Sequence, residues 1–248
     1  MQIDYPTLPA VKYVAFDFCG TLAELLPGTS ELLQGFVRDT YGLEVSAPAV
    51  QDALRNTSLE LPYSSVKINS RELRTSYYYE FNARLLDYLG CTPALPDELY
   101  DHFSAHKRHW TIKPGGRELL DELRRRGYEL VVASNFDDNL ETLLVGLGVR
   151  DSFSHLFVSA VLGVEKPSAA FYECIVAGLG CEPGQIVMVG DDLVLDIYPS
   201  SAVGMNNIHL GHDAGEKVSR WVKEGSGQYI QVTDFAGILE VLPGPAAR

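Results

Sequence analysis

Four side chains that can act in catalysis each follow an apolar run typical of a buried strand. They are Asp17, Ser134, Lys166 and Asp191. The carboxyl ends of parallel strands meet at one edge of a sheet, and ligands bind beyond that edge. We therefore expect these four groups, although far apart in the sequence, to form a single site.

Their chemistry is complementary. A carboxylate such as Asp17 can attack an electrophile and form a covalent ester or acyl phosphate. A second carboxylate, Asp191, can help to hold a hard cation that prefers oxygen ligands. Lys166 and Ser134 can neutralise and hydrogen-bond the oxygens of a transferred group, and the lysine would also keep the crowded carboxylates ionised.

From residue 111 onward, short apolar strands alternate with helices, which is typical of βαβ units around a parallel sheet. Strands are expected at 128–133, 156–159, 186–189, 207–210 and 229–232, and helices at 117–126, 140–147, 169–179 and 235–242. The segment 32–110 lacks short valine-rich strands, and its helices are expected at 31–41, 47–56, 70–89 and 98–109. We therefore predict an α/β protein: a Rossmann-like doubly wound parallel sheet core, residues 1–24 and 111–248, with an inserted α-helical cap, residues 25–110.

Composition narrows the class of protein. The 248 residues carry a net charge of −13, which disfavours binding to nucleic acid or to an anionic membrane surface. The first ten residues lack the pattern of a signal peptide, and no apolar run approaches ~18 residues. The four cysteines are scattered without CxxC spacing, which indicates reduced thiols and a cytoplasmic location.

The motifs around the four groups resemble those of the haloacid dehalogenase superfamily of hydrolases. The family's first motif, DxDxT, is similar to residues 17–21, DFCGT, and its second is a serine or threonine that ends a strand, as Ser134 does in VVASNFD. Its third motif is a lysine, matched by Lys166 in EKP, and its fourth is GDxxxD, matched by residues 190–196. The resemblance extends from Lys12 to Leu242, and a helical cap between the first two motifs is found in a large subgroup of the family.

The resemblance implies a role for each matching position. Asp17 would be the nucleophile, Ser134 and Lys166 would bind the transferred group, and Mg²⁺ would be held by Asp17, the backbone carbonyl of Cys19 and Asp191. Further supporting positions are Thr21 and Asn135 as substrate contacts, and Asp192 and Asp196 as groups that orient the water on the metal or Lys166 or that simply cap the next helix. The implied partner is a small phosphorylated metabolite, and the expected state is a monomer or homodimer.

Cys19 departs from the family pattern. In the family's phosphatases the second aspartate of DxD protonates the leaving oxygen and then activates water. A thiol, with an ordinary pKa near ~8.5, is a poor replacement. The metal site should survive, because this position contributes its backbone oxygen, but leaving-group protonation and turnover should suffer.

Three functions remain open. The favoured one is a Mg²⁺-dependent phosphatase or phosphotransferase. A 2-haloacid dehalogenase-type C–X hydrolase needs neither a metal nor a general acid, which fits Cys19, but the acidic fourth motif would repel a carboxylate substrate. The third is a catalytically weak relative that binds a phosphorylated ligand or a partner protein.

Two clusters in the expected cap have a functional and a structural interpretation. Arg74 and Tyr78 lie four residues apart on one helix face, where they would select substrate or form a solvated row over packed tyrosines. His102, His106 and His109 recur at helical spacing on the expected helix 98–109, which fits an exposed face better than a metal cluster.

Overall fold

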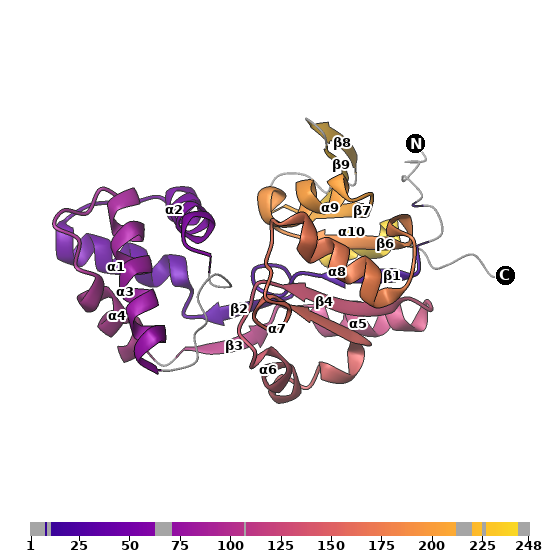
Figure 1. Cartoon of the computed structure of the whole chain (residues 1–248), viewed down its shortest axis with the longest axis horizontal. Helices are drawn as coiled ribbons and strands as arrows, with labels where there is room; N and C mark the ends of the chain where they lie inside the picture. Colours follow the sequence, from indigo (N-terminus) through magenta and orange to yellow (C-terminus); the bar gives the residue numbers. More distant parts are fainter. Residues whose placement is uncertain are drawn as a thin grey trace. The chain divides into compact units, whose positions relative to one another are not determined.

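The computed structural model describes residues 8, 11–62, 71–106, 108–211, 220–224 and 227–242. The chain folds as two compact units, one formed by Met1–Glu24 with Thr111–Arg248 and the other by Leu25–Trp110. We call them the sheet unit and the helical unit, and each can be followed by its colours in Figure 1. Among the described residues, every helix falls short of the length and apolar character needed to cross a membrane.

The sheet unit is built on a seven-stranded sheet with the order β5-β4-β1-β6-β7-β9-β8. The described strands are β1 (Tyr13–Phe16), β4 (Glu129–Ser134), β5 (His155–Val158), β6 (Ile186–Gly190), β7 (Asn206–Leu210), β8 (Arg220–Glu224) and β9 (Gly227–Val232). All neighbouring pairs are parallel except β8 with β9, at one edge. The predicted parallel sheet is therefore confirmed, and the antiparallel β8 was not expected from the sequence.

The order of strands creates a crevice at one place. The chain adds β4 and β5 on one side of β1 and then returns to add β6, β7 and β9 on the other side. Connections that depart in opposite directions from two adjacent strands open a crevice at the strands' carboxyl ends. That place lies between β1, which Asp17 follows, and β6, which Asp191 follows.

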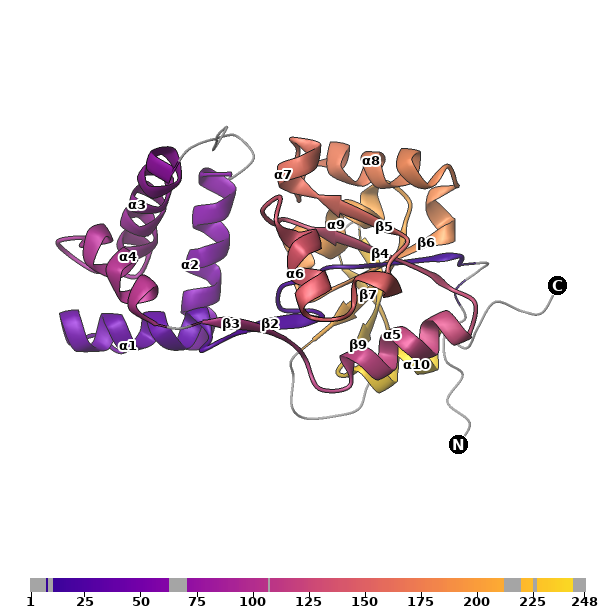
Figure 2. The same cartoon turned by 90° about the horizontal axis from the view of Figure 1, so that it is seen from below.

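Helices cover both faces of the sheet, as Figure 2 shows. On one face lie α8 (Ala169–Leu179) and α9 (Tyr198–Ala202), and on the other lie α5 (Gly116–Arg125) and α10 (Phe235–Val241). Two shorter helices, α6 (Leu140–Gly146) and α7 (Ser159–Leu162), follow β4 and β5. Phe171, Tyr172 and Ile175 of α8 are fully buried in a cluster with residues of β1, β4 and β6. Burial on both faces explains why the central strands are almost entirely apolar.

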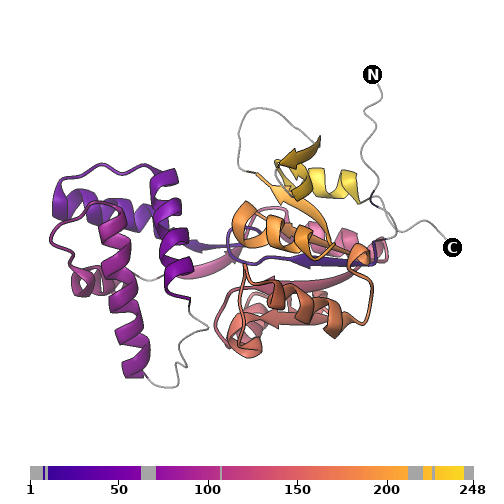
Figure 3. The same cartoon turned by 45° about the horizontal axis from the view of Figure 1, so that its top comes forward.

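The described part of the helical unit contains α1 (Thr29–Tyr41), α2 (Ala47–Glu60), α3 (Arg71–Tyr88) and α4 (Pro96–Ala105), which Figure 3 shows as a group. Their shared core includes Leu33, Phe36, Leu85 and Leu99. Gly42, at φ 69°, ends α1 in the left-handed conformation that glycine adopts readily.

Two short strands occur where the chain enters and leaves the helical unit. These are β2 (Ala23–Leu26) and β3 (His109–Ile112), which pair as a two-stranded sheet. The expected helix 98–109 is therefore wrong at its end: α4 stops at Ala105, and His106 has an extended backbone. Because His109 lies in β3, the three histidines do not share a helix face. Strand pairing between the two chain crossings, which no local pattern reveals, overrides the helical spacing.

Candidate active site

Asp17 lies immediately after β1 with its carboxylate almost completely buried. Its backbone N–H donates to the carbonyl of Val189 at 2.9 Å, which ties the residue to β6. Oδ1 accepts hydrogen bonds from Lys166 Nζ at 2.7 Å and from Ser134 Oγ at 3.2 Å. Oδ2 is buried and has no hydrogen-bond partner among the described residues. One oxygen is thus fixed by the protein, and the other is left for a group that the protein does not supply.

Lys166 joins two carboxylates. Its ammonium, with 3% of the side chain exposed, lies 2.7 Å from Asp17 Oδ1 and 2.6 Å from Asp196 Oδ1. Burial by itself would lower the pKa of this lysine, but the negative charges of Asp17 and Asp196 outweigh burial and hold the pKa above its ordinary value. Lys166 is therefore a permanent cation, and the sequence-based expectation that Asp196 orients it agrees with this geometry.

Asn135 fixes the backbone of Lys166. Its Nδ2 donates to the Lys166 carbonyl at 2.9 Å, and its Oδ1 accepts from the Lys166 N–H at 2.8 Å. Both ends of the amide are thereby committed to one residue. Its observed contacts position the lysine, and its expected contact with substrate stays a prediction.

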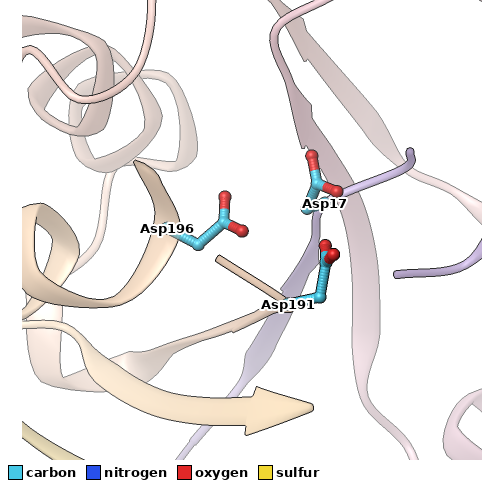
Figure 4. A group of neighbouring side chains, drawn as sticks. All are labelled: Asp17, Asp191 and Asp196. Atoms are coloured by element: carbon cyan, nitrogen blue, oxygen red, sulfur yellow. The ribbon is translucent and has the colours of Figure 1, made fainter. Parts of the chain in front are cut away.

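Asp191 completes an acidic cluster at the carboxyl ends of β1 and β6. Oxygens of Asp17, Asp191 and Asp196 all lie within 4.8 Å of one another, and Figure 4 shows the three side chains turned toward a common space. Thr21, completely buried, donates from Oγ1 to Asp191 Oδ1 at 2.9 Å. The Thr21 hydroxyl thus orients this carboxylate, and its expected contact with substrate stays a prediction.

The cluster carries more negative than positive charge. Burial raises the pKa of Asp17 and raises that of Asp196 to about 8, although Lys166 pulls both values down. Lys166 supplies the ammonium that pairs with two of the three carboxylates, those of Asp17 and Asp196. This excess of buried oxygen donors, together with the unpartnered Oδ2 of Asp17, fits a hard divalent cation such as Mg²⁺.

The other two acidic residues of the fourth motif, Asp192 and Asp196, stabilise the turn after β6. Asp192 caps the turn of π-helix Leu193–Ile197, because its Oδ1 accepts from the N–H groups of Val194 at 2.8 Å and Leu195 at 3.0 Å. Asp196 Oδ2 accepts from the Asp192 N–H at 3.1 Å. A side chain at Gly190 would clash with Asp196, so the close packing of this turn requires the glycine of the motif.

Cys19 and Gly20 form the turn that follows Asp17. Gly20 has φ 90°, and a Cβ there would lie 2.5 Å from Asp191 Oδ2, so a larger residue would displace that carboxylate. Desolvation, followed by the charges of Asp17 and Asp191, raises the pKa of the Cys19 thiol. Although the residue as a whole is exposed, the negative charges of both carboxylates disfavour a thiolate at this position. The thiol is thus protonated at neutral pH and unsuited to act as a base.

Lys113 is a residue of the site that the sequence reasoning missed. Its Nζ donates to the Gly20 carbonyl, and its backbone N–H donates to the Leu22 carbonyl at 2.9 Å. Lys113 directly follows β3, and its two hydrogen bonds hold the turn that contains Cys19. The only feature of the sequence that pointed to Lys113 as a site residue was its position just before Pro114 and Gly115, where the chain re-enters the sheet unit.

The two expected substrate contacts in the helical unit have different outcomes. The side chain of Arg74 lies outside the described residues. The ring of Tyr78 lies 5.3 Å from that of Tyr77 and 6.5 Å from that of Tyr100, and it lines a cavity within the helical unit.

Comparison with known proteins adds an independent observation. The family model of haloacid dehalogenase-like hydrolases matches residues 11–204. Haloacid dehalogenase-like hydrolase domain-containing protein 3 from Homo sapiens is 28% identical, covering 85% of this chain and 86% of that protein. The match to its Mus musculus counterpart, at 36% identity, covers 49% of this chain and only about half, 47%, of that protein.

A phosphatase and a dehalogenase are also similar to this chain. Glyceraldehyde 3-phosphate phosphatase from Pyrococcus furiosus is 30% identical, covering 94% of this chain and 93% of that protein. The structure of L-2-haloacid dehalogenase from Xanthobacter autotrophicus superposes with a TM-score of 0.55 at 18% identity, covering 82% of this chain and 79% of that one. The latter likeness concerns the fold alone.

Proposed function

The chain belongs to the haloacid dehalogenase-like hydrolases, and we propose that within this family it is a Mg²⁺-dependent phosphatase acting on a small phosphorylated metabolite. The observation that carries the proposal is the asymmetric environment of the Asp17 carboxylate. Oδ1 is held by Lys166 and Ser134, while the buried Oδ2 has no partner among the described residues. The similarity to a glyceraldehyde 3-phosphate phosphatase over 94% of the chain supports a phosphate ester as substrate.

Asp17 and Asp191 would hold Mg²⁺ together with the backbone carbonyl of Cys19. The cation would neutralise charge on the phosphoryl oxygens and so permit an anionic nucleophile to approach an anionic substrate. Asp196 is less suited to direct binding, because both its oxygens already accept hydrogen bonds, one from Lys166 and one from the Asp192 N–H.

In the first half of the reaction, a carboxylate oxygen of Asp17 attacks phosphorus and the bond from phosphorus to the ester oxygen breaks. The products are an aspartyl-phosphate and the alkoxide of the leaving group, which must take a proton. In the second half, water attacks phosphorus, the bond to Asp17 breaks, and inorganic phosphate leaves with the carboxylate restored. Lys166 and Ser134 would donate hydrogen bonds to the phosphoryl oxygens, whose charge is spread in the transition state.

Cys19 is expected to slow both halves of the reaction. A thiol of raised pKa is a weak acid toward the departing alkoxide and no base toward water. Leaving groups that are stable as anions, such as those of aryl and acyl phosphates, need no such proton. We therefore expect these substrates to be hydrolysed faster than alkyl or sugar phosphates.

We propose that the helical unit, residues 25–110, acts as a cap that admits substrate and excludes water during attack. The substrate-contact roles of Arg74 and Tyr78 are part of this proposal. The chain passes from one unit to the other within β2 and again within β3, and these two connections would form the hinge of such a cap.

The proposal is tested by screening phosphorylated metabolites and aryl phosphates with the wild type and Asp17→Asn side by side in Mg²⁺. Release of inorganic phosphate by the wild type, abolished in Asp17→Asn and by a chelator, is the expected result. Phosphate release that persists in Asp17→Asn would contradict the assigned nucleophile.

The second candidate is a C–X hydrolase, which Cys19 favours because halide leaves without a proton. The acidic residues Asp191 and Asp196 beside Asp17 disfavour it, since they would repel a haloacid carboxylate. Halide release from 2-chloropropionate in the presence of a chelator would support this candidate, and its absence would exclude that substrate.

A further inference from the structure

The helical unit contains a cavity of about 350 Å³ formed entirely by its own residues. Its walls come from all four helices and from the segment between α4 and β3. The lining residues include Tyr78, Phe81, Asn82, Tyr100, Phe103 and Arg108. The volume lies at the lower end of the range of small-molecule sites, which suits a ligand of one or two rings.

Four of the ten described lining residues are aromatic, and they recur in a regular pattern. Tyr78 and Phe81 of α3 are three residues apart, as are Tyr100 and Phe103 of α4, so each pair shares a helix face. The Tyr78 and Tyr100 rings lie 6.5 Å apart at 43°. Ring faces and edges on two facing helices provide surfaces on which a flat aromatic ligand can pack.

Arg108 brings a positive charge to the same cavity, and its contacts with described residues include three that hold it in place. Nη2 donates to Thr29 Oγ1 at 2.5 Å, Nε donates to the Pro27 carbonyl at 3.2 Å, and the guanidinium lies 5.3 Å from the centre of the Phe103 ring. These contacts fix the orientation of the guanidinium and its positive charge, and a carboxylate or phosphate is the kind of group with which arginine forms charge-assisted hydrogen bonds.

Asn82 is a second polar group in the wall. It is 4% exposed, and its Nδ2 donates to the Pro96 carbonyl at 3.2 Å. Asn82 occupies the position on α3 that continues the face of Tyr78 and Phe81 toward Leu85. An amide and a guanidinium among aromatic rings form the mixed lining that is typical of a ligand site.

We propose that this cavity binds a small aromatic acid, with its ring between α3 and α4 and its anionic group on Arg108. The proposal goes beyond the phosphatase function, because the site uses no residue of the Asp17 cluster, although it shares Tyr78 with the substrate contacts proposed above. Arg108 also joins the beginning of α1 to the segment before β3 through Thr29 and Pro27. The anionic group of the ligand would therefore bind Arg108, the residue that links the segment at the beginning of α1 to the segment before β3.

The test is isothermal titration calorimetry of the full chain, in the Asp17→Asn background, with phenylacetate, its neutral isostere 2-phenylacetamide, and acetate. Phenylacetate should bind about tenfold more tightly than 2-phenylacetamide, the factor expected for a charge-assisted hydrogen bond, and acetate should not bind measurably. Because Asp17→Asn removes catalysis, the outcome does not depend on the proposed phosphatase activity.

Two variants locate the binding. Arg108→Gln should abolish the preference for the carboxylate, whereas Arg38→Gln, which removes an exposed arginine of α1, should leave it unchanged. Ser104→Trp, which fills the cavity from its wall, should abolish binding of both ring compounds. Methyl NMR signals of Leu54 and Leu85, which line the cavity, should shift on addition of phenylacetate to the parent protein.

The proposal is overturned if phenylacetate does not bind the parent protein, or if it binds Ser104→Trp as tightly. Equal affinity for phenylacetate and 2-phenylacetamide would also overturn it, because the site would then be an apolar gap without a role for Arg108. If Arg108→Gln fails to fold, the methyl shifts and the Ser104→Trp result still decide the question.

Discussion

Thr21 donates a 2.9 Å hydrogen bond to Asp191. This contact joins the first motif to the fourth, although the two residues are 170 positions apart in the sequence. Thr21 lies in the turn after β1, and Asp191 lies in the turn after β6. The hydroxyl holds the carboxylate beside Asp17, where the cation of the proposed mechanism would bind. The threonine of the first motif thus acts through the aspartate of the fourth.

Thr21→Val is expected to raise the Mg²⁺ concentration needed for half-maximal activity by about 10–100-fold, the usual effect of removing a group that orients a metal ligand. Turnover at saturating Mg²⁺ should change much less. Activity measured against Mg²⁺ concentration checks this. Thr57→Val, which removes a buried hydroxyl bonded to the Ala53 carbonyl in the helical unit, is the matched control. A fall in turnover with an unchanged Mg²⁺ requirement would show that Thr21 acts elsewhere.

Asp191→Asn is expected to stabilise the protein in the presence of a chelator, because it removes one charge from a cluster in which three carboxylates face one lysine. The wild type, by contrast, should gain thermal stability when Mg²⁺ is added, since a ligand that binds only the folded state stabilises it. The melting temperatures of both proteins with Mg²⁺ and with a chelator test this. Asp138→Asn, at an exposed position after β4, should behave like the wild type. A Mg²⁺-dependent rise of equal size in Asp191→Asn would contradict the proposed metal site.

Glu122 on α5 gives a pH-dependent contribution to stability. Hydrogen bonds from Arg125 and then Arg126 lower its pKa from 4.5 to about 2 in the folded protein. Arg126 in turn donates to the Leu242 carbonyl at 2.6 Å, so the pair links α5 to the residue after α10. Because the folded-state pKa is depressed, the stabilisation is complete above the unfolded pKa and is lost as the pH falls toward 2.

The difference in melting temperature between the wild type and Glu122→Gln should therefore be largest above about pH 5 and shrink as the pH approaches 3. Glu118→Gln controls for the loss of one negative charge on the same helix. A difference that grows as the pH falls would refute the assignment.

Cys19→Asp is expected to raise turnover of alkyl phosphates by up to about 10²–10⁴-fold, the range of general acid–base catalysis. Turnover of aryl phosphates should rise less, because their leaving groups need no proton. The ratio of the two rates in the variant and in the wild type measures the effect. Cys174→Asp, a substitution of a half-buried thiol on α8, controls for introducing a carboxylate. An unchanged ratio would mean that the thiol is not the limiting feature.

Sequence patterns predicted the fold where the structure depends on local periodicity. β1, β4 and β6 are continuous apolar runs, and the groups at their carboxyl ends come together as the topology of a parallel sheet requires. The pairing of β2 with β3 and of β8 with β9 was not predicted, because β2, β3 and β8 depend on partners rather than on a pattern of their own.

Within the candidate site, the structure gives contacts that the sequence did not predict. Asn135 binds the backbone of Lys166, Thr21 binds Asp191, and Lys113 holds the turn of Cys19. Each of these contacts joins segments that are distant in sequence. A single sequence contains no signal for such contacts, since it shows which groups can form hydrogen bonds but not which groups the fold brings within reach.

The central claim, that Asp17 is the nucleophile, is tested most directly by the mass of the protein after reaction. Wild type and Asp17→Asn are mixed with Mg²⁺ and 4-nitrophenyl phosphate, quenched in acid, and analysed intact and as peptides. We expect one phosphoryl group on the peptide containing Asp17 in the wild type, accumulating because Cys19 slows its hydrolysis, and none in Asp17→Asn. Hydrolysis without such a phosphoenzyme, or a phosphoryl group that persists in Asp17→Asn, would contradict it.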